Sequence, residues 1–129
     1  MAKLQIQTEQ GSYPIMIQPG AIRSLQDYLP DGNDWIVITD KNVAKEYGGC
    51  WEAPHQYVLE PGEGSKSMDA VGTVLEYMLT NGLSRRTVVV AIGGGVVGDT
   101  AGFIASIFLR GVPFIQVPTT LLAQVDSSV

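Results

Sequence analysis

The sequence has few residues that could form a disulfide or bind a soft metal ion. It contains one cysteine, Cys50, and one histidine, His55, among 129 residues. A single cysteine cannot form an internal disulfide, and the two residues together are too few for the three or four ligands of a zinc site. No apolar run reaches the ~18 residues that cross a bilayer, and the first residues lack the apolar segment of a signal peptide. We therefore expect a cytoplasmic protein with no membrane partner.

Positive charge is also scarce. Eight Lys and Arg residues against 13 Asp and Glu residues give a formal net charge of -5 at pH 7 and a pI of about 4.6. This sign opposes binding along a nucleic-acid backbone. The chain is 45% hydrophobic and 16% charged, and its mean hydropathy is +0.14. These values predict one compact domain with part of its apolar surface covered by a partner, so we expect a homodimer or another form of self-association.

The order of the apolar segments predicts an α/β fold. Alternation over 3–8 and 13–17 predicts an antiparallel strand pair, and apolar spacing from Gly20 to Leu29 predicts a short helix. Four later apolar runs are typical of parallel strands buried on both faces. These strands are predicted at 35–39, 56–59, 87–92 and 114–117. Three helices are predicted between them: the first ends near Tyr47, the second lies between Ser67 and Asn81, and the third ends near Phe108. The expected architecture is Rossmann-like, a mostly parallel sheet flanked by helices.

A glycine cluster follows the third predicted parallel strand. Gly93, Gly95 and Gly98 satisfy the G-x-G-x-x-G pattern between a strand and a helix. Such glycines let the backbone turn tightly and let a bulky anion approach main-chain N–H groups at a helix N-terminus. We favour phosphate binding over the alternative that Gly98, Gly102 and Ser106 form a small-residue seam for packing. The late position of the motif, and the lack of an acidic residue about 20 positions later, argue against an ordinary Rossmann dehydrogenase.

Polar side chains follow all four predicted parallel strands, and the carboxyl ends of such strands share one edge of the sheet. We expect a common ligand site there, formed by Asp40 and Asn42, Glu63 and Lys66, Gly94 to Asp99, and Thr119 and Thr120. Asp40 is expected to contact a ribose, with capping of the next helix as the alternative. Asp99 is expected in the first helical turn, where it accepts hydrogen bonds from a ribose or an amide or caps the helix. Lys66 could bind a phosphate, pair with Glu63 or be solvated.

Expectations for four other residues follow, and two of them, Arg110 and Asp126, carry open alternatives. Arg110 interrupts an apolar environment, and a buried guanidinium needs an anionic partner, either a structural carboxylate or a substrate phosphate. Asp126 is either catalytic or part of a polar chain end. His55 is expected on the surface, and Cys50, beside Trp51, is expected to pack.

Four segments resemble the amino-terminal domain of the 3-dehydroquinate synthase family. They are TDKNV, PGEGSKS, GGGVVGDTAGF and LRGVPFIQVPTTLLAQVDSSV, and with them the resemblance covers essentially the whole chain. The glycine motif is shared with glycerol dehydrogenase and iron-dependent alcohol dehydrogenases, whereas VPTTLLAQVDSSV is more specific to the synthase and its cyclase relatives. The resemblance implies that 1–129 is an NAD-binding domain, truncated before a carboxyl-terminal domain in which relatives bind zinc or cobalt through a Glu and two His.

The resemblance also implies a role for each candidate residue. Asp40 and Asn42 would contact the adenosine side of NAD, and the loop Gly62, Glu63, Gly64, Ser65 and Lys66 its ribose region. The pyrophosphate would lie against Gly94, Gly95, Val96, Val97 and Gly98, and the nicotinamide half against Asp99, Thr119 and Thr120. The proposed catalytic residues are Arg110, which would bind the substrate phosphate, and Asp126, which would lie near the reacting carbons.

Members of this family convert a phosphorylated sugar acid, 3-deoxy-D-arabino-heptulosonate 7-phosphate, into 3-dehydroquinate and phosphate on the shikimate route to chorismate and the aromatic amino acids. NAD is recovered after each turnover. Because the metal ligands are missing from this sequence, we expect the chain alone to lack appreciable activity. The alternatives are the nucleotide domain of another sugar-phosphate cyclase or of a metal-dependent polyol dehydrogenase, and a catalytically silent dimerisation module.

Overall fold

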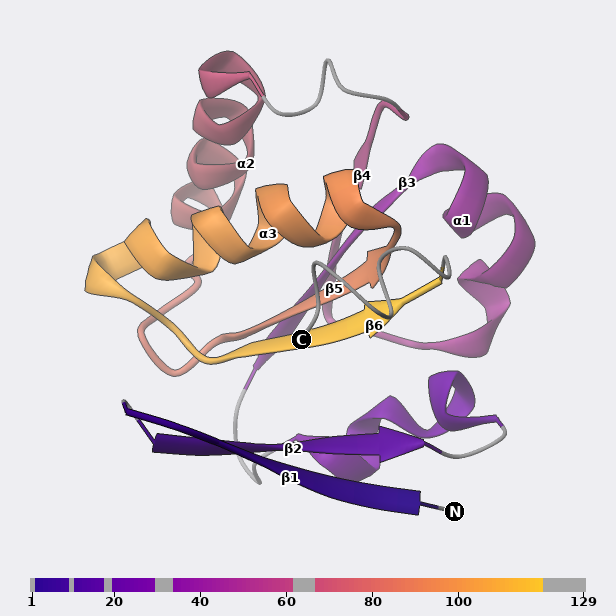
Figure 1. Cartoon of the computed structure of the whole chain (residues 1–129). Helices are drawn as coiled ribbons and strands as arrows, with labels where there is room; N and C mark the ends of the chain where they lie inside the picture. The colour runs from indigo at the N-terminus through magenta and orange to yellow at the C-terminus, as the bar shows by residue number, and fades with distance from the viewer. Residues whose placement is uncertain (1, 10, 18–19, 30–33, 62–66, 120–129) are drawn as a thin grey trace.

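The computed structural model describes residues 2–9, 11–17, 20–29, 34–61 and 67–119 (Figure 1). Its centre is a four-stranded sheet in the order β4-β3-β5-β6, and all three neighbouring pairs are parallel. The strands are β3 (Trp35–Asp40), β4 (His55–Leu59), β5 (Val88–Gly93) and β6 (Phe114–Pro118). The predicted Rossmann-like parallel sheet is therefore confirmed, with strand ends within one residue of the expected ones.

Helices cover both faces of this sheet. Successive side chains along a strand point to opposite faces, and both faces carry apolar residues that are buried under the helices. Helices α2 (Met68–Thr80) and α3 (Gly95–Ile107) pack on the face that carries Ile36 and Ile38 of β3. The other face, which carries Val37, is covered by α1 (Lys41–Tyr47), by the 3-10 helix η1 (Ala21–Tyr28) and by the segment around the short 3-10 turn η2 (Gly48–Cys50). Every residue of β5 is buried, which explains why the strand reads as an apolar run without alternation.

The connections leave the two central strands in opposite directions. From β3 the chain passes through α1 to β4 at one edge of the sheet, whereas from β5 it passes through α3 to β6 at the other. Because α1 and α3 lie on opposite faces, the carboxyl ends of β3 and β5 form the switch point at which open α/β sheets have their ligand-binding crevice.

The amino-terminal strands form a separate sheet. β1 (Ala2–Thr8) and β2 (Gly11–Ile17) pair antiparallel in a two-stranded sheet, which lies below the main sheet in Figure 1. The expected helix after Gly20 is η1, a 3-10 helix with a non-helical Ser24 inside it. The Ser24 hydroxyl donates to the Ala21 carbonyl at 3.4 Å, a local bond that competes with regular helix geometry.

Two smaller expectations concern single residues. Cys50 is half-buried and packs against the apolar cluster around Trp51, in agreement with a packing role. His55 is half-buried rather than fully on the surface, because it opens β4 and pairs in register with Ile36. In the part of the chain that the structure describes, no helix combines the length and apolar character needed to span a membrane.

Candidate functional site

The glycine cluster forms the passage from β5 into α3. The N-cap residue of α3 is Gly94, which has no side chain to cap the first turn, and the first main-chain bond of the helix runs from the Gly98 N–H to the Gly94 carbonyl at 3.0 Å. The N–H groups of Gly95, Val96 and Val97 therefore have no partner within the helix. Together with the helix dipole, these groups favour an anion at this end of α3.

Close packing explains the glycines better than an unusual backbone conformation does. A Cβ at Gly93 would lie 2.7 Å from the Cβ of Val97, a side chain that is 2% exposed. Among the described glycines, positive φ angles occur at 11, 20, 82 and 111, outside the 93–98 cluster. The tight turn expected from the sequence thus rests on the close approach of helix and strand, without left-handed residues.

Of the three residues of the predicted packing seam, Gly98 and Gly102 do pack closely against the sheet. A Cβ at Gly98 would lie 3.2 Å from Gln116 Oε1, and one at Gly102 would lie 3.3 Å from the Phe114 ring, so both glycines let α3 approach β6. Ser106 does not belong to this seam. It is exposed, and its hydroxyl donates to the Phe103 carbonyl at 2.6 Å.

At the end of β3, Asp40 is half-buried and is the N-cap of α1. Its Oδ1 accepts the Val43 N–H at 2.9 Å, so the expected capping alternative is confirmed. A carboxylate has about four lone-pair positions, so one such bond leaves capacity for a ligand. Asn42 is exposed in the first turn of α1. Lys41 pairs with Glu60 at 2.6 Å, an exposed ion pair at the neighbouring strand end that contributes little stability.

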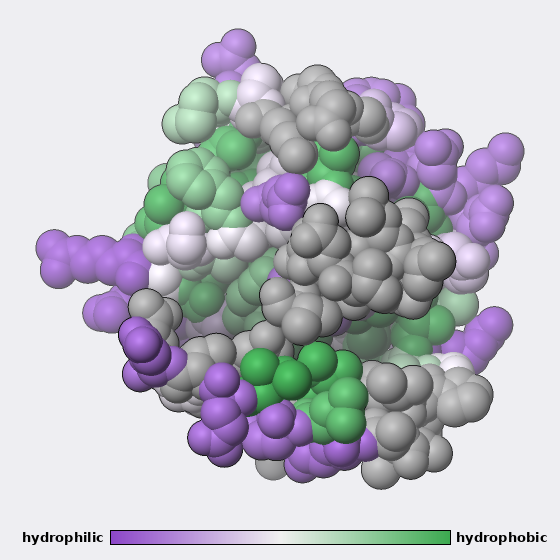
Figure 2. Space-filling model, in the orientation of Figure 1, coloured by the Kyte–Doolittle hydropathy of each residue, from purple (hydrophilic) through white to green (hydrophobic). Residues whose placement is uncertain are grey.

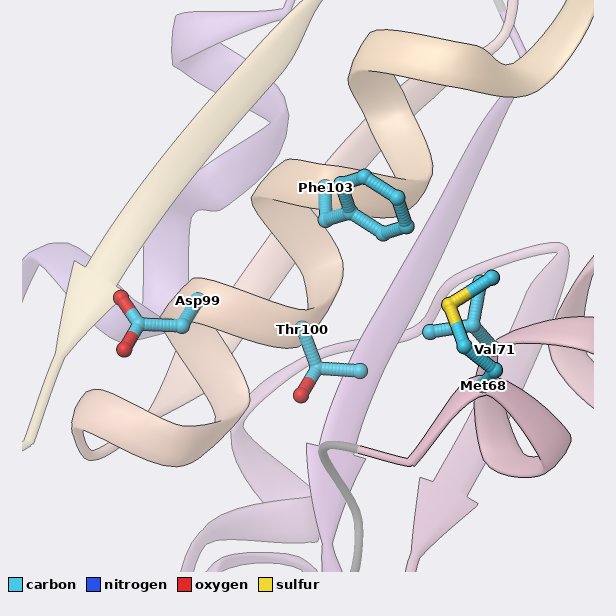
Figure 3. Close-up of a pocket in the computed structure, with 5 residues that line it drawn as sticks. All are labelled: Met68, Val71, Asp99, Thr100 and Phe103. Atoms are coloured by element: carbon cyan, nitrogen blue, oxygen red, sulfur yellow. The ribbon is translucent and has the colours of Figure 1, made fainter.

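The segment after β6 is tied to the glycine cluster, because the Thr119 N–H donates to the Gly93 carbonyl at 2.9 Å. Asp99 is the fifth residue of α3, since the helix begins at Gly95. The expectation that Asp99 lies in the first turn is therefore wrong, and the N-cap position belongs to Gly94. Asp99 is exposed, and its carboxylate points away from α2 (Figure 3).

A hollow of about 180 Å³ lies between the start of α2 and the middle of α3 (Figure 3). It is lined by Met68, Val71, Asp99, Thr100 and Phe103. Met68 is 70% exposed because it stands in the first turn of α2, at the rim of this hollow. No pattern in the sequence singles out Phe103 or the buried Thr100 as lining a hollow, because apolar and small residues surround them in the chain.

Arg110 does not reach this site within its own chain. It follows the carboxyl end of α3, whereas the glycine cluster precedes the amino end, and a helix of this length spans about 20 Å. The expectation of a buried guanidinium is wrong, because Arg110 is exposed. The backbone turns through left-handed conformations at Leu109 (φ 46°) and Arg110 (φ 72°), which carries the side chain to the surface.

Several expected site residues lie outside the described residues: Gly62, Glu63, Gly64, Ser65, Lys66, Thr120 and Asp126. The described candidates are Asp40, Asn42, Gly94 to Asp99 and Thr119, which follow the carboxyl ends of β3, β5 and β6 in the chain. Within the ranges that the structure describes, no three or more His, Cys, Asp or Glu side chains gather in a group that could hold a metal ion.

Comparisons with known proteins agree on one family. The family model for the 3-dehydroquinate synthase N-terminal region matches residues 56–129. The chain is 47% identical over 135 residues to 3-dehydroquinate synthase of Alkaliphilus metalliredigens, and 43% identical over 138 residues to that of Bordetella pertussis. Both alignments cover 100% of this chain and 38% of the relative. The chain thus spans well under half the length of these relatives.

Solved structures of related cyclases share the fold. The crystal structure of 2-deoxy-scyllo-inosose synthase with carbaglucose-6-phosphate, NAD+ and Co2+ has a TM-score of 0.79 and 32% identity, and the match covers 98% of this chain and 37% of that one. A 2-epi-5-epi-valiolone synthase from Streptomyces hygroscopicus, with NAD+ and Zn2+ bound, has a TM-score of 0.74 and 27% identity over 88% of this chain and 34% of the other.

Proposed function

This chain belongs to the 3-dehydroquinate synthase family, and from this premise we propose that residues 1–129 form an NAD-binding domain. The observation that carries the proposal is the position of the glycine cluster. It opens α3 at the crevice between β3 and β5, where the first-turn N–H groups have no partner within the helix. Side chains larger than hydrogen at Gly93 and Gly98 would meet Val97 and Gln116, so the glycines keep the helix start close to the strand ends.

We propose that the described residues bind the two ends of the dinucleotide. The first-turn N–H groups of α3 would bind the pyrophosphate, and Asp40 and Asn42 would bind the adenosine side. Asp99 and Thr119, with Thr120, would bind the nicotinamide half. For the ribose region we propose Glu63 and Lys66, within the loop 62–66. Bound NAD supplies a reversible hydride acceptor, and the contribution of this chain is to hold and orient it.

For the full-length enzyme we propose the reaction that the family name describes, elimination of phosphate from a phosphorylated sugar acid to give 3-dehydroquinate in aromatic amino acid biosynthesis. A zinc or cobalt ion would come from protein ligands outside this sequence. Arg110 would bind the substrate phosphate and Asp126 would lie near the reacting carbons. Because Arg110 lies far from the glycine cluster of its own chain, we propose that it serves the site of a second copy in a homodimer. We also propose a cytoplasmic location.

A second candidate is another sugar-phosphate cyclase, because 2-deoxy-scyllo-inosose synthase shares the fold at 32% identity. Substrate choice would then rest on residues beyond this chain.

NAD binding is tested by titrating the 129-residue chain with NADH and following the coenzyme fluorescence. We expect saturable binding. Asp40→Asn preserves the helix cap, because Asn caps as well as Asp, but removes the charge that a ribose diol would contact. It should weaken binding about tenfold. Glu46→Gln, at an exposed carboxylate later in α1, is the control and should bind NADH as the wild type does. Equal affinity of the Asp40→Asn and wild-type chains would contradict the role of Asp40, and absence of saturable binding would contradict the function.

Inactivity of the isolated chain is a separate prediction. Without a metal ion to polarise the hydroxyl that is oxidised, most of the transition-state stabilisation is lost. The purified chain, free of host synthase, should release no phosphate from 3-deoxy-D-arabino-heptulosonate 7-phosphate above the blank, whereas a full-length relative assayed in parallel should. Phosphate release by the chain at a rate comparable to the relative would refute this prediction.

A further inference from the structure

Thr39 occupies the last hydrogen-bonded position between the two central strands. The register of β3 and β5 ends at the pair Thr39 and Ile92. The Thr39 hydroxyl is fully buried and donates to the Ile92 carbonyl at 2.7 Å, across 53 positions of sequence. A side-chain bond therefore reinforces the two strands at the point where they separate.

The residues that follow this pair lead directly into the candidate site. Asp40 comes after Thr39 and starts α1, and Gly93 comes after Ile92 and leads to the N-cap of α3. The Gly93 carbonyl in turn accepts the Thr119 N–H at 2.9 Å. Two hydrogen bonds, from Thr39 to Ile92 and from Thr119 to Gly93, thus link the carboxyl ends of β3, β5 and β6 at the crevice.

Packing alone does not account for a hydroxyl at this position. Thr39 is as buried as Ile38 and Ile92, its apolar neighbours in the two strands. Valine has nearly the same shape and would avoid the free energy of removing a hydroxyl from water. The hydroxyl offsets that free energy only through the bond that it makes.

We propose that Thr39 is a positioning residue for dinucleotide binding: its hydroxyl fixes the separation between Asp40 and the glycine cluster, so that both halves of the coenzyme meet a preformed site. This inference rests on the proposed NAD-binding function. Preorganisation of this kind raises affinity because less ordering is left for the binding step.

The test compares three variants of the 129-residue chain by NADH fluorescence titration. Thr39→Val keeps the β-branched shape and removes the donor, and it should weaken binding about fivefold to tenfold. Thr39→Ser keeps the donor and should bind within about twofold of the wild type. Thr87→Val is the matched control. Thr87 is also fully buried, but it lies at the amino end of β5, where its Oγ1 accepts the Ser84 N–H at 3.0 Å. Thr87→Val should lower the unfolding midpoint and leave NADH affinity unchanged.

A second measurement separates this inference from the proposed function. Amide hydrogen exchange of Gly98 and Thr119, whose N–H groups donate to the Gly94 and Gly93 carbonyls, is measured without coenzyme and should be faster in Thr39→Val than in the wild type and in Thr87→Val. If the wild type does not bind NADH, the proposed function fails, and the exchange rates still decide whether Thr39 positions the cluster. Unchanged exchange in Thr39→Val, or equal loss of affinity in Thr87→Val, would overturn the inference. Should Thr39→Val not fold, Thr39→Cys offers similar size with a weaker donor for the same comparison.

Discussion

At Gly93 the main chain lies against the side chain of Val97, four residues further on. The hydrogen atom of the glycine is what allows this contact, because a Cβ would come within 2.7 to 3.0 Å of three Val97 carbon atoms. Val97 lies in α3, where it is buried against the sheet, and it has little room to move. A single residue thus sets how closely the helix start approaches the end of β5.

Gly93→Ala should therefore lower the free energy of unfolding by about 1–3 kcal/mol, the usual range for overpacking. Gly72→Ala is the matched control, because Gly72 is exposed within α2 and a Cβ there would meet nothing within 4 Å. It should raise the free energy of unfolding by about 0.5–1 kcal/mol. Urea denaturation with a common m-value measures both, and a Gly93→Ala chain as stable as the wild type would show that Val97 can yield.

Single residues also show where sequence reasoning stops. Asp40 was predictable both as a ligand candidate and as a helix cap, because a carboxylate between a strand and a helix has only a few local roles. Thr39, immediately before it, was not singled out, because a threonine in a β-branched strand has no pattern of its own. The exposure of Arg110 was mispredicted, because the left-handed turn at Leu109 and Arg110 is unusual for residues with a side chain.

Among the elements, α2 shows how local signals define a helix. Its start is set by Ser67, whose Oγ accepts the Ala70 N–H at 3.1 Å. Its buried stripe is Val71, Val74 and Met78, at helical spacing. Just beyond its end, Gly82 takes a left-handed φ of 73°. The helix predicted between Ser67 and Asn81 is confirmed, because its start, spacing and end depend on residues close in sequence.

Ser67→Ala should lower the free energy of unfolding by about 1 kcal/mol, because the Ala70 N–H would lose its side-chain partner. Ser67→Asp should preserve stability, since Asp caps equally well and its charge is favourable near a helix N-terminus. Thermal or urea unfolding of the three chains provides the comparison. Similar losses in both variants would mean that Ser67 acts through some contact other than the cap.

The sheet order could not be predicted in the same way. The four strands were expected from their apolar runs, but their placement as β4-β3-β5-β6 depends on pairing between segments far apart in the chain. The crevice between β3 and β5 follows from that order. Asp40 lies beside the glycine cluster because β3 and β5 are neighbours in the sheet, and no local motif predicts that pairing.

On the scale of the whole molecule, apolar residues remain on the surface. Figure 2 shows green residues over the β1–β2 pair and along the side of α2 and α3. The large ones are Met68, Leu79, Phe103 and Ile107 on α2 and α3, with exposed fractions from 41% to 70%, and Leu4 on β1, which is 51% exposed. This distribution agrees with the mean hydropathy of +0.14 and with a surface that contacts a partner.

We therefore predict that the 129-residue chain self-associates through the exposed apolar residues of α2 and α3, Met68 and Phe103 among them. Static light scattering should show an apparent mass that rises with concentration. The double substitution Met68→Lys and Phe103→Lys should raise the dissociation constant about tenfold or more, because charges would replace apolar contact. Leu4→Lys, on the separate two-stranded sheet, is the control and should leave association unchanged. A monomeric wild type at all concentrations would contradict the prediction.

The amino-acid order by itself determined the strands, the helix starts and the glycine cluster, because side-chain periodicity, capping residues and glycine act over a few neighbouring positions. Tertiary structure decided which strands are neighbours and which carbonyl the Thr39 hydroxyl binds. It also decided that Arg110 faces solvent, far from the carboxyl ends of the strands. These features arise from contacts between residues tens of positions apart, and such contacts form only when the hydrophobic faces of strands and helices are buried against one another.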